Sequence, residues 1–254
     1  MTMILSVVSR KGGTGKTTTA VNLAAYLSDN FRVLLIDIDS QCGATYESGI
    51  YNTDTPGIND LLTGKKSVEE VLHKTTYKYD MIISTPMLSF TEMSMNRYNT
   101  NYLKKLISPI EDRYDIIIID TPPTESPLTA FSIVASTHII ITAQTDRRSL
   151  DSLALTVDEV YILKENVNPN LKIIGILPTM HYSKAIVSRV MLEKMQEKYK
   201  ELVLPFIVKY SAVYKEASLA SIPLRYYLNK SALEDEPYNK LATYIGDICR
   251  NSTN

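Results

Sequence analysis

The stretch that decides the fold lies at residues 10–18 and reads Arg10-Lys11-Gly12-Gly13-Thr14-Gly15-Lys16-Thr17-Thr18. It follows the apolar, β-branched run MILSVVS at 3–9 and opens a segment, 16–29, whose apolar residues recur at helical spacing. A glycine-rich loop between a buried strand and a helix is the setting of a phosphate-binding loop. The glycines let backbone N–H groups turn toward an anion, and the helix N-terminus adds partial positive charge.

The position of each side chain in such a loop predicts its role. Lys16 is expected to bridge the β- and γ-phosphates, Thr17 to ligate Mg²⁺ and Thr18 to hydrogen-bond the α-phosphate. Lys11 begins the loop and points away from its own phosphates in the ordinary geometry, so its charge suits a nucleotide bound by a second subunit. Arg10 stands where the standard pattern has Gly.

Apolar runs alternate with helical patterns along the rest of the chain. This alternation predicts an α/β fold, a P-loop NTPase-like, mostly parallel twisted sheet with helices on both faces, as a single domain over 1–254. A capping-box pattern of Ser67 and Glu70 marks a short helix at 67–73. The expected strands are 31–38, 79–84, 114–120, 137–142, 171–177 and 203–208, and the expected helices are 57–62, 67–73, 95–107, 128–135, 149–164, 184–200 and 233–249.

Composition narrows the class of protein. The chain has 254 residues, with 44% hydrophobic and 22% charged residues and a net charge of -1. These globular values exclude disorder and leave nucleic-acid binding to a local patch. Cys42 and Cys249 are too far apart, among three scattered histidines, to suggest a disulfide framework or a zinc site, which fits a reducing cytoplasm. The run at 3–8 is too short for a membrane span.

Acidic residues end two of the buried runs. Asp37 and Asp39 lie two apart in LLIDIDSQ, so their side chains share one face, and Asp120 ends the run IIIID before Thr121-Pro122-Pro123. Carboxyl ends of parallel strands border the ligand site in such sheets. We therefore expect these carboxylates beside the loop, where they orient Mg²⁺-bound water and the attacking water.

The motif KGGTGKTT, with the paired aspartates and IIIIDTPP, resembles the deviant Walker A class of the ParA/MinD superfamily, and nearly the whole chain resembles the ParA (Soj) partition ATPases. The resemblance implies a slow, Mg²⁺-dependent ATPase in which Lys11 reaches across an ATP-sandwiched homodimer. It assigns Asp39 to hydrolysis and magnesium, Asp37 to a supporting role and Asp120 to magnesium. The family pattern continues Pro-Gln-Gly where this chain has Ser40-Gln41-Cys42-Gly43. The residues that the resemblance places near adenine are Pro178, Thr179, Met180 and Pro205.

The last third of the chain offers an output surface. Between His181 and Lys230 there are nine basic and four acidic residues. Such a patch suits sequence-independent phosphate contacts, although part of it is ordinary charge pairing along a helix. By resemblance, the ATP-bound dimer coats nucleoid DNA and a ParB-like centromere-binding partner stimulates hydrolysis and release. The candidate DNA contacts are Lys184, Arg189, Lys209, Lys215 and Arg225.

Two alternatives remain open. A ParA-like ATPase that positions another cargo shares every motif above, and a small-molecule P-loop enzyme shares the nucleotide site. The final segment, EPYNKLATYIGDICRNSTN, lacks the basic stripe of a membrane-binding amphipathic helix, so we expect no membrane partner. The chain also begins at the first strand with no helix-turn-helix before it, which is expected for the short form of the family.

Overall fold

A seven-stranded sheet forms the centre of the computed structural model, with strand order β3-β4-β2-β5-β1-β6-β7. Every neighbouring pair is parallel except β3 and β4, which run antiparallel. The structure describes residues 1–50, 54–95, 99–123 and 126–253. The strands are β1 Met3–Val8, β2 Val33–Asp37, β3 Leu72–Lys74, β4 Asp80–Ile82, β5 Ile116–Asp120, β6 His138–Gln144 and β7 Lys172–Thr179.

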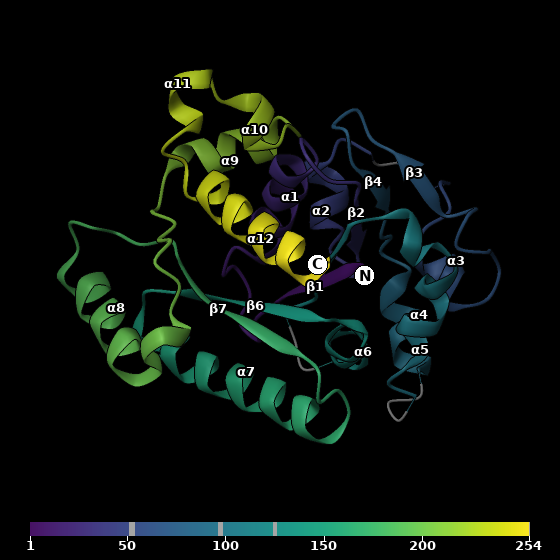
Figure 1. The fold of residues 1–254 in the computed structure, drawn as a ribbon, viewed down its shortest axis with the longest axis horizontal. Helices are drawn as coiled ribbons and strands as arrows, with labels where there is room; N and C mark the ends of the chain where they lie inside the picture. The colour runs from purple at the N-terminus through teal and green to yellow at the C-terminus, as the bar shows by residue number, and fades with distance from the viewer. Residues whose placement is uncertain (51–53, 96–98, 124–125, 254) are drawn as a thin grey trace.

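Helices cover both faces of this sheet (Figure 1). The helix α12, in yellow, lies along α1 on one face, while α5, α6 and α7 lie on the other. The helices are α1 Lys16–Leu27, α2 Gly43–Glu47, α3 Ile58–Leu62, α4 Leu88–Ser94, α5 Tyr102–Ile107, α6 Pro127–Ala135, α7 Arg147–Asn166, α8 Ile186–Tyr199, α9 Ala212–Leu219, α10 Leu224–Tyr227, α11 Lys230–Leu233 and α12 Pro237–Thr253, with 3-10 turns at Ser108–Arg113 and Lys200–Leu202.

The central strands are apolar on both sides because both of their faces are covered. In β1, Leu5 and Val7 join the core beneath α1 and α12, whereas Ile4 joins the core beneath α5 and α6. All six residues of β1 and all five of β5 are buried. This burial explains why continuous apolar runs, rather than alternating ones, marked the strands in the sequence. The α/β class and the mostly parallel sheet are confirmed.

Three expected elements differ from the structure. The expected helix at 67–73 is wrong: Ser67 N–H does donate to Glu70 Oε2 at 2.9 Å, but the chain then forms β3 against β4. The expected strand at 203–208 is wrong too, since only Val203 makes a bridge, to Ile176. Within the expected helix 95–107, residues 96–98 lie outside the described part of the chain, and α5 begins at Tyr102.

A half-buried side chain, Glu47, joins α2 to α9. Glu47, at the end of α2, accepts a hydrogen bond from Ser218 Oγ of α9 at 2.9 Å. Burial raises the pKa of Glu47 to about 7, and the nearby Asp37 adds to the shift. The folded state therefore holds a proton that the unfolded chain releases near pH 4.5, so this group lowers stability as the pH rises from about 4.5 to about 7.

We expect Glu47→Gln to flatten this pH dependence and to increase the free energy of unfolding at pH 8 by about 1–2 kcal/mol, while leaving it nearly unchanged at pH 4.5. Urea unfolding at several pH values measures the effect. Glu70→Gln is the matched control, because the pKa of Glu70 is lowered by its hydrogen bond from Lys66 and the group stabilises when ionised. An equal increase in the free energy of unfolding of both variants at pH 8 would contradict the assignment of this pH dependence to Glu47.

Candidate nucleotide-binding site

The loop between β1 and α1 has the backbone of an anion-binding loop. Gly13 and Gly15 adopt left-handed φ angles of 71° and 81°, where a side chain would be strained. Gly15 occupies the N-cap of α1 and makes no side-chain hydrogen bond to the first turn. Thr14 fixes the loop to the sheet, because its hydroxyl contacts Thr142 Oγ1 at 2.9 Å and its carbonyl accepts from Thr179 Oγ1 at 2.8 Å. The first N–H groups of α1 are thus held in place without a capping side chain.

Lys16 is a buried cation at this helix end. Only 6% of the residue is exposed, and burial lowers its pKa, although the charges of Asp120 and Asp39 act in the opposite direction. A lysine held this far from water is favoured as a cation when an anion reaches it. Its position at the first residue of α1 places that anion over the loop's N–H groups.

Asp120 and Thr17 form the part of the site that fits a divalent cation. Thr17 Oγ1 donates to Asp120 Oδ2 at 2.8 Å, whereas Asp120 Oδ1 is buried and has no hydrogen-bond partner among the described residues. Burial raises the pKa of Asp120 well above its usual value, with a further contribution from Asp37. A magnesium ion would ionise this carboxyl group and use its unpartnered oxygen.

The described residues contain no cluster of three His, Cys, Asp or Glu side chains that could hold a metal by themselves. Mg²⁺ commonly uses one or two protein oxygens and completes its shell with phosphate and water. Asp120 and the hydroxyl of Thr17 are the groups that could hold it.

The two aspartates after β2 have different surroundings. Asp37 is fully buried and accepts three hydrogen bonds, from Asp39 N–H at 3.1 Å and from Thr45 N–H and Oγ1 at 2.8 and 2.7 Å. These bonds tie α2 to β2, which is a supporting role. Asp39 is 8% exposed and accepts from Gln41 N–H at 2.9 Å. Its charge acts on Lys16, so it belongs to the loop side of the site. Its expected part in water positioning stays a prediction.

Gly43 has a structural role that sequence reasoning missed. A Cβ atom at this position would lie 3.0 Å from Thr17 Cγ2 and 3.2 Å from Thr17 Oγ1. Glycine therefore lets α2 approach the hydroxyl that contacts Asp120. Cys42, just before it, is buried and adopts a left-handed φ of 56° to start the helix. The close approach joins residues 17 and 43 across two elements, and no local pattern contains it.

The residues expected near adenine separate into two pairs. Thr179 and Met180 line a small pocket together with Gly15 and Thr18 of the loop. Pro178 and Pro205 are not among the lining residues of that pocket; the Pro178 carbonyl accepts from Val208 N–H at 2.9 Å, and Pro205 is exposed. The structure thus brings Thr179 and Met180, but not the two prolines, to the phosphate loop.

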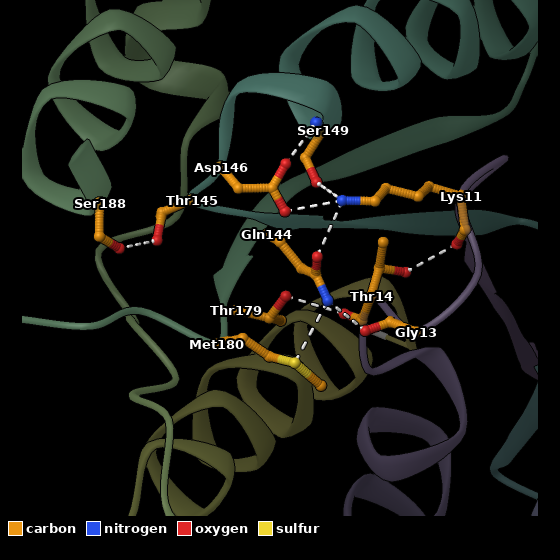
Figure 2. Close-up of polar contacts among 10 residues, drawn as sticks. All are labelled: Lys11, Gly13, Thr14, Gln144, Thr145, Asp146, Ser149, Thr179, Met180 and Ser188. Carbon is orange, nitrogen blue, oxygen red and sulfur yellow. Dashed lines mark hydrogen bonds and ion pairs between the residues drawn. The ribbon is translucent and has the colours of Figure 1, made fainter. Parts of the chain in front are cut away.

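Lys11 points away from its own loop, toward the start of α7 (Figure 2). Its Nζ donates to Gln144 Oε1 at 2.9 Å, Asp146 Oδ2 at 2.7 Å and Ser149 Oγ at 2.8 Å. Sequence reasoning missed these three acceptors, which lie 133 to 138 residues further along the chain. The expected contact of Lys11 with a nucleotide of a second subunit stays a prediction.

The expected DNA contacts do not form one uniform set. Lys184 and Arg189, at the start of α8, are exposed, as is Lys209. Lys209 and Lys215 line the pocket beside Gly15 and Thr18. Arg225 Nε pairs with Asp29 Oδ2 at 2.8 Å, just past the C-terminal end of α1.

The fold, the glycine-rich loop and the buried Lys16 define a P-loop NTPase. Residues 2–173 match the family described as AAA domain. The chain is 34% identical over 233 residues to the chromosome partitioning protein ParA of Myxococcus xanthus, covering 90% of this chain and 82% of that protein. It is 30% identical to the sporulation initiation inhibitor protein Soj of Bacillus subtilis, covering 89% of this chain and 92% of Soj.

Among solved structures, a putative plasmid partition protein of Borrelia burgdorferi bound to AMPPNP superposes with a TM-score of 0.81 at 25% identity, covering 99% of this chain and 100% of that chain. These matches extend over nearly the whole fold and include both sides of the site. The chain belongs to the ParA/Soj family of ATPases.

We expect Thr17→Val to remove the magnesium dependence of nucleotide binding, because valine keeps the shape of the side chain and lacks the hydroxyl. Affinity in EDTA should change by less than about threefold, while affinity with Mg²⁺ should fall by about tenfold or more. Titration of a fluorescent ATP analogue measures both. Thr63→Val, at an exposed helix end, is the control and should bind nucleotide like the wild type. If Mg²⁺ still increases the nucleotide affinity of Thr17→Val, the assignment of Thr17 to the magnesium site is contradicted.

Proposed function

We propose that this chain is a DNA partition ATPase: Mg·ATP drives a sandwich homodimer, the dimer binds DNA without sequence preference, and a ParB-like centromere-binding partner stimulates hydrolysis and release. Repetition of this cycle moves plasmid or chromosomal cargo in the cytoplasm, with the protein associated with the nucleoid. The observation that carries the proposal is a buried Lys16, whose pKa is lowered by burial and raised by the charge of Asp120, beside a helix N-terminus that no side chain caps. Within the described residues, Asp120 Oδ1 has no hydrogen-bond partner.

The residues around the loop divide the work of hydrolysis. The N–H groups of Gly12 to Thr18 and the ammonium of Lys16 bind and orient the phosphates, and Asp39 orients the attacking water. When bound, Mg²⁺ neutralises phosphate charge beside Asp120 and Thr17. Asp37 holds the β2 end in place through Thr45. In this proposal the residues act by orienting the phosphates and the water and by supplying charge, and none of them acts as a nucleophile. Such a site suits slow turnover that a partner accelerates.

The position of Lys11 supports the proposed dimer. The amine lies outside its own loop, near the β6–α7 junction, so it is suited to the phosphates of a nucleotide bound by a second copy. The fold and the family support this geometry. ATP would then be held between two subunits, and removal of its γ-phosphate would weaken the pair.

For DNA, we favour Lys184 and Arg189, because both are exposed and neither lines the nucleotide pocket. Lys209 and Lys215 are exposed but line that pocket, and Arg225 is held by Asp29, so each of these three has another role available. Of the helices in the described residues, none has the length and apolar character needed to cross a membrane.

The first test is binding of non-specific duplex DNA with ATP, ADP or no nucleotide, with molecular mass recorded in solution. We expect binding and a dimer with ATP alone, and a steep loss of affinity as salt increases. Lys16→Ala should abolish nucleotide binding, and Lys11→Ala should abolish the dimer. A dimer that ignores DNA at low salt would instead favour a ParA-like ATPase for another cargo, and turnover of a metabolite without DNA would favour a small-molecule enzyme.

We expect the double variant Lys184→Glu, Arg189→Glu to lower DNA affinity by about tenfold or more while the ATP-dependent dimer still forms. Each reversal replaces attraction to phosphate with repulsion. The double variant Lys65→Glu, Lys104→Glu, at exposed positions just past α3 and in α5, is the control for the same change of net charge. Fluorescence anisotropy with labelled DNA measures affinity, and equal losses in the double variant and the control would contradict a local surface at α8.

A further inference from the structure

A cavity of about 370 Å³ opens at the amino ends of β1, β6 and β7, at the opposite edge of the sheet from the phosphate loop. It is lined by Met3, His138 and Lys172, which begin these three strands, and by Cys249 of α12. The C-terminal end of α12 lies next to the N-terminus at this edge (Figure 1). Because β1 runs from Met3 to Val8 before the loop begins, the cavity and the loop are about 17 Å apart along the strand. The cavity is therefore separate from the nucleotide site.

The register of the sheet turns the lining side chains to one face. His138 is in register with Leu5 of β1 and with Lys172 of β7, so these three side chains point to the same side of the sheet. Leu5 belongs to the core beneath α1 and α12, which also contains Met3 and Cys249. The imidazole of His138 and the thiol of Cys249 thus border one cavity although they lie 111 residues apart in the sequence.

Contacts of Thr137 determine which ring nitrogen of His138 carries the hydrogen. Thr137 Oγ1 accepts from Ile4 N–H at 2.9 Å and donates to the Ile4 carbonyl at 3.1 Å. The single hydroxyl hydrogen is then used, so the 2.8 Å contact between Thr137 Oγ1 and His138 Nδ1 is satisfied when Nδ1–H donates. Burial and the charge of Lys172 lower the pKa of His138 to about 4, so the ring is neutral at pH 7. Its Nε2 therefore presents a lone pair.

His138 Nε2 is a buried acceptor that lacks a donor. The residue is 5% exposed, and this nitrogen has no hydrogen-bond partner among the described residues. An unpaired buried acceptor destabilises the folded chain, because it has lost its hydrogen bonds to water. A ligand that enters the cavity and donates an O–H to Nε2 would remove this cost.

The other lining residues define the rest of the ligand. Met3 and Cys249 are buried and give the cavity an apolar wall. Lys172 is exposed, and it carries the one charged side chain among the described residues that line the cavity. A ligand here would meet an acceptor, an apolar wall and a cation. A metal ion fits less well, because Lys172 repels it and the described residues contain no cluster of three His, Cys, Asp or Glu side chains.

We propose that this cavity binds a small organic acid with an apolar body, whose hydroxyl group donates to His138 Nε2 and whose carboxylate pairs with Lys172. This would be a second ligand site, at the opposite edge of the sheet from the nucleotide. Its existence does not depend on the proposed function, because none of the residues that form it belongs to the phosphate loop.

The ring nitrogens of His138 provide the first test. In ¹⁵N NMR of the ligand-free full chain, we expect the hydrogen of the neutral ring on Nδ1 and none on Nε2. A hydrogen on Nε2 would overturn the proposal, because that nitrogen could then accept nothing from a ligand.

Binding is tested with meta- and para-hydroxybenzoate, which place the hydroxyl at two spacings from the carboxylate. Benzoate lacks the donor, and the methyl ester of each hydroxybenzoate lacks the anion. The ring signals of His138 report binding, with Mg·ADP present so that the phosphate loop is occupied. We expect one hydroxybenzoate to bind about tenfold more tightly than benzoate and about threefold more tightly than its own ester. Equal affinity for both hydroxybenzoates and benzoate, or unchanged His138 signals, would overturn the proposal.

Two variants assign the contacts, with calorimetry as the measurement. His138→Phe should bind the hydroxybenzoate and benzoate equally, because its ring has no acceptor. Lys172→Gln should bind the hydroxybenzoate and its ester equally, whereas Lys65→Gln, at an exposed position outside the lining, should keep the preference for the acid. Lys172→Gln alters an exposed side chain, so this comparison remains decisive even if His138→Phe does not fold. A preference for the acid that persists in Lys172→Gln would overturn the proposal.

Discussion

Four ionisable side chains meet at the carboxyl end of the sheet, nearly removed from water: Lys16, Asp37, Asp39 and Asp120. Burial lowers the pKa of the lysine and raises the pKa of each carboxyl group, so the charged form of each of the four is less favoured than it is in water. Asp37 is compensated by its bonds to Thr45. A ligand that brings phosphate to Lys16 and a cation to Asp120 stabilises the charged forms of these two side chains. Mg·ATP supplies both groups.

The sheet determines which of these groups are neighbours. Asp120 of β5 is in register with Val7 of β1 on one side and with Asp37 of β2 on the other. The loop that leaves β1 therefore starts beside β5, the strand that carries Asp120. Strand order also places β6 on the opposite side of β1. The same loop can thus contact phosphate-site carboxylates through Thr17 and the β6–α7 junction through Lys11.

Local patterns succeeded where one segment decides its own structure and were wrong where a distant segment decides it. The buried runs around Leu35 and Ile118 needed no partner to be recognised as strands, because a short β-branched run that is apolar throughout is typical of a strand covered on both faces. The capping contact of Ser67 formed as expected, yet pairing with β4 drew Leu72–Lys74 into a strand. Arg225 shows the same limit, since its ion pair with Asp29 crosses 196 residues.

The sequence by itself determined the class of protein, the loop and its Lys16, Thr17 and Asp120, because these depend on residue type within short, strongly patterned segments. Only the tertiary structure decided that Gly43 packs on Thr17 and that Asp37 accepts hydrogen bonds from Thr45. It also decided which side chains contact Lys11, namely Gln144, Asp146 and Ser149. The physical reason is the parallel sheet. Its crossovers bring together strand ends that are far apart in the chain, and no local pattern records which ends become neighbours.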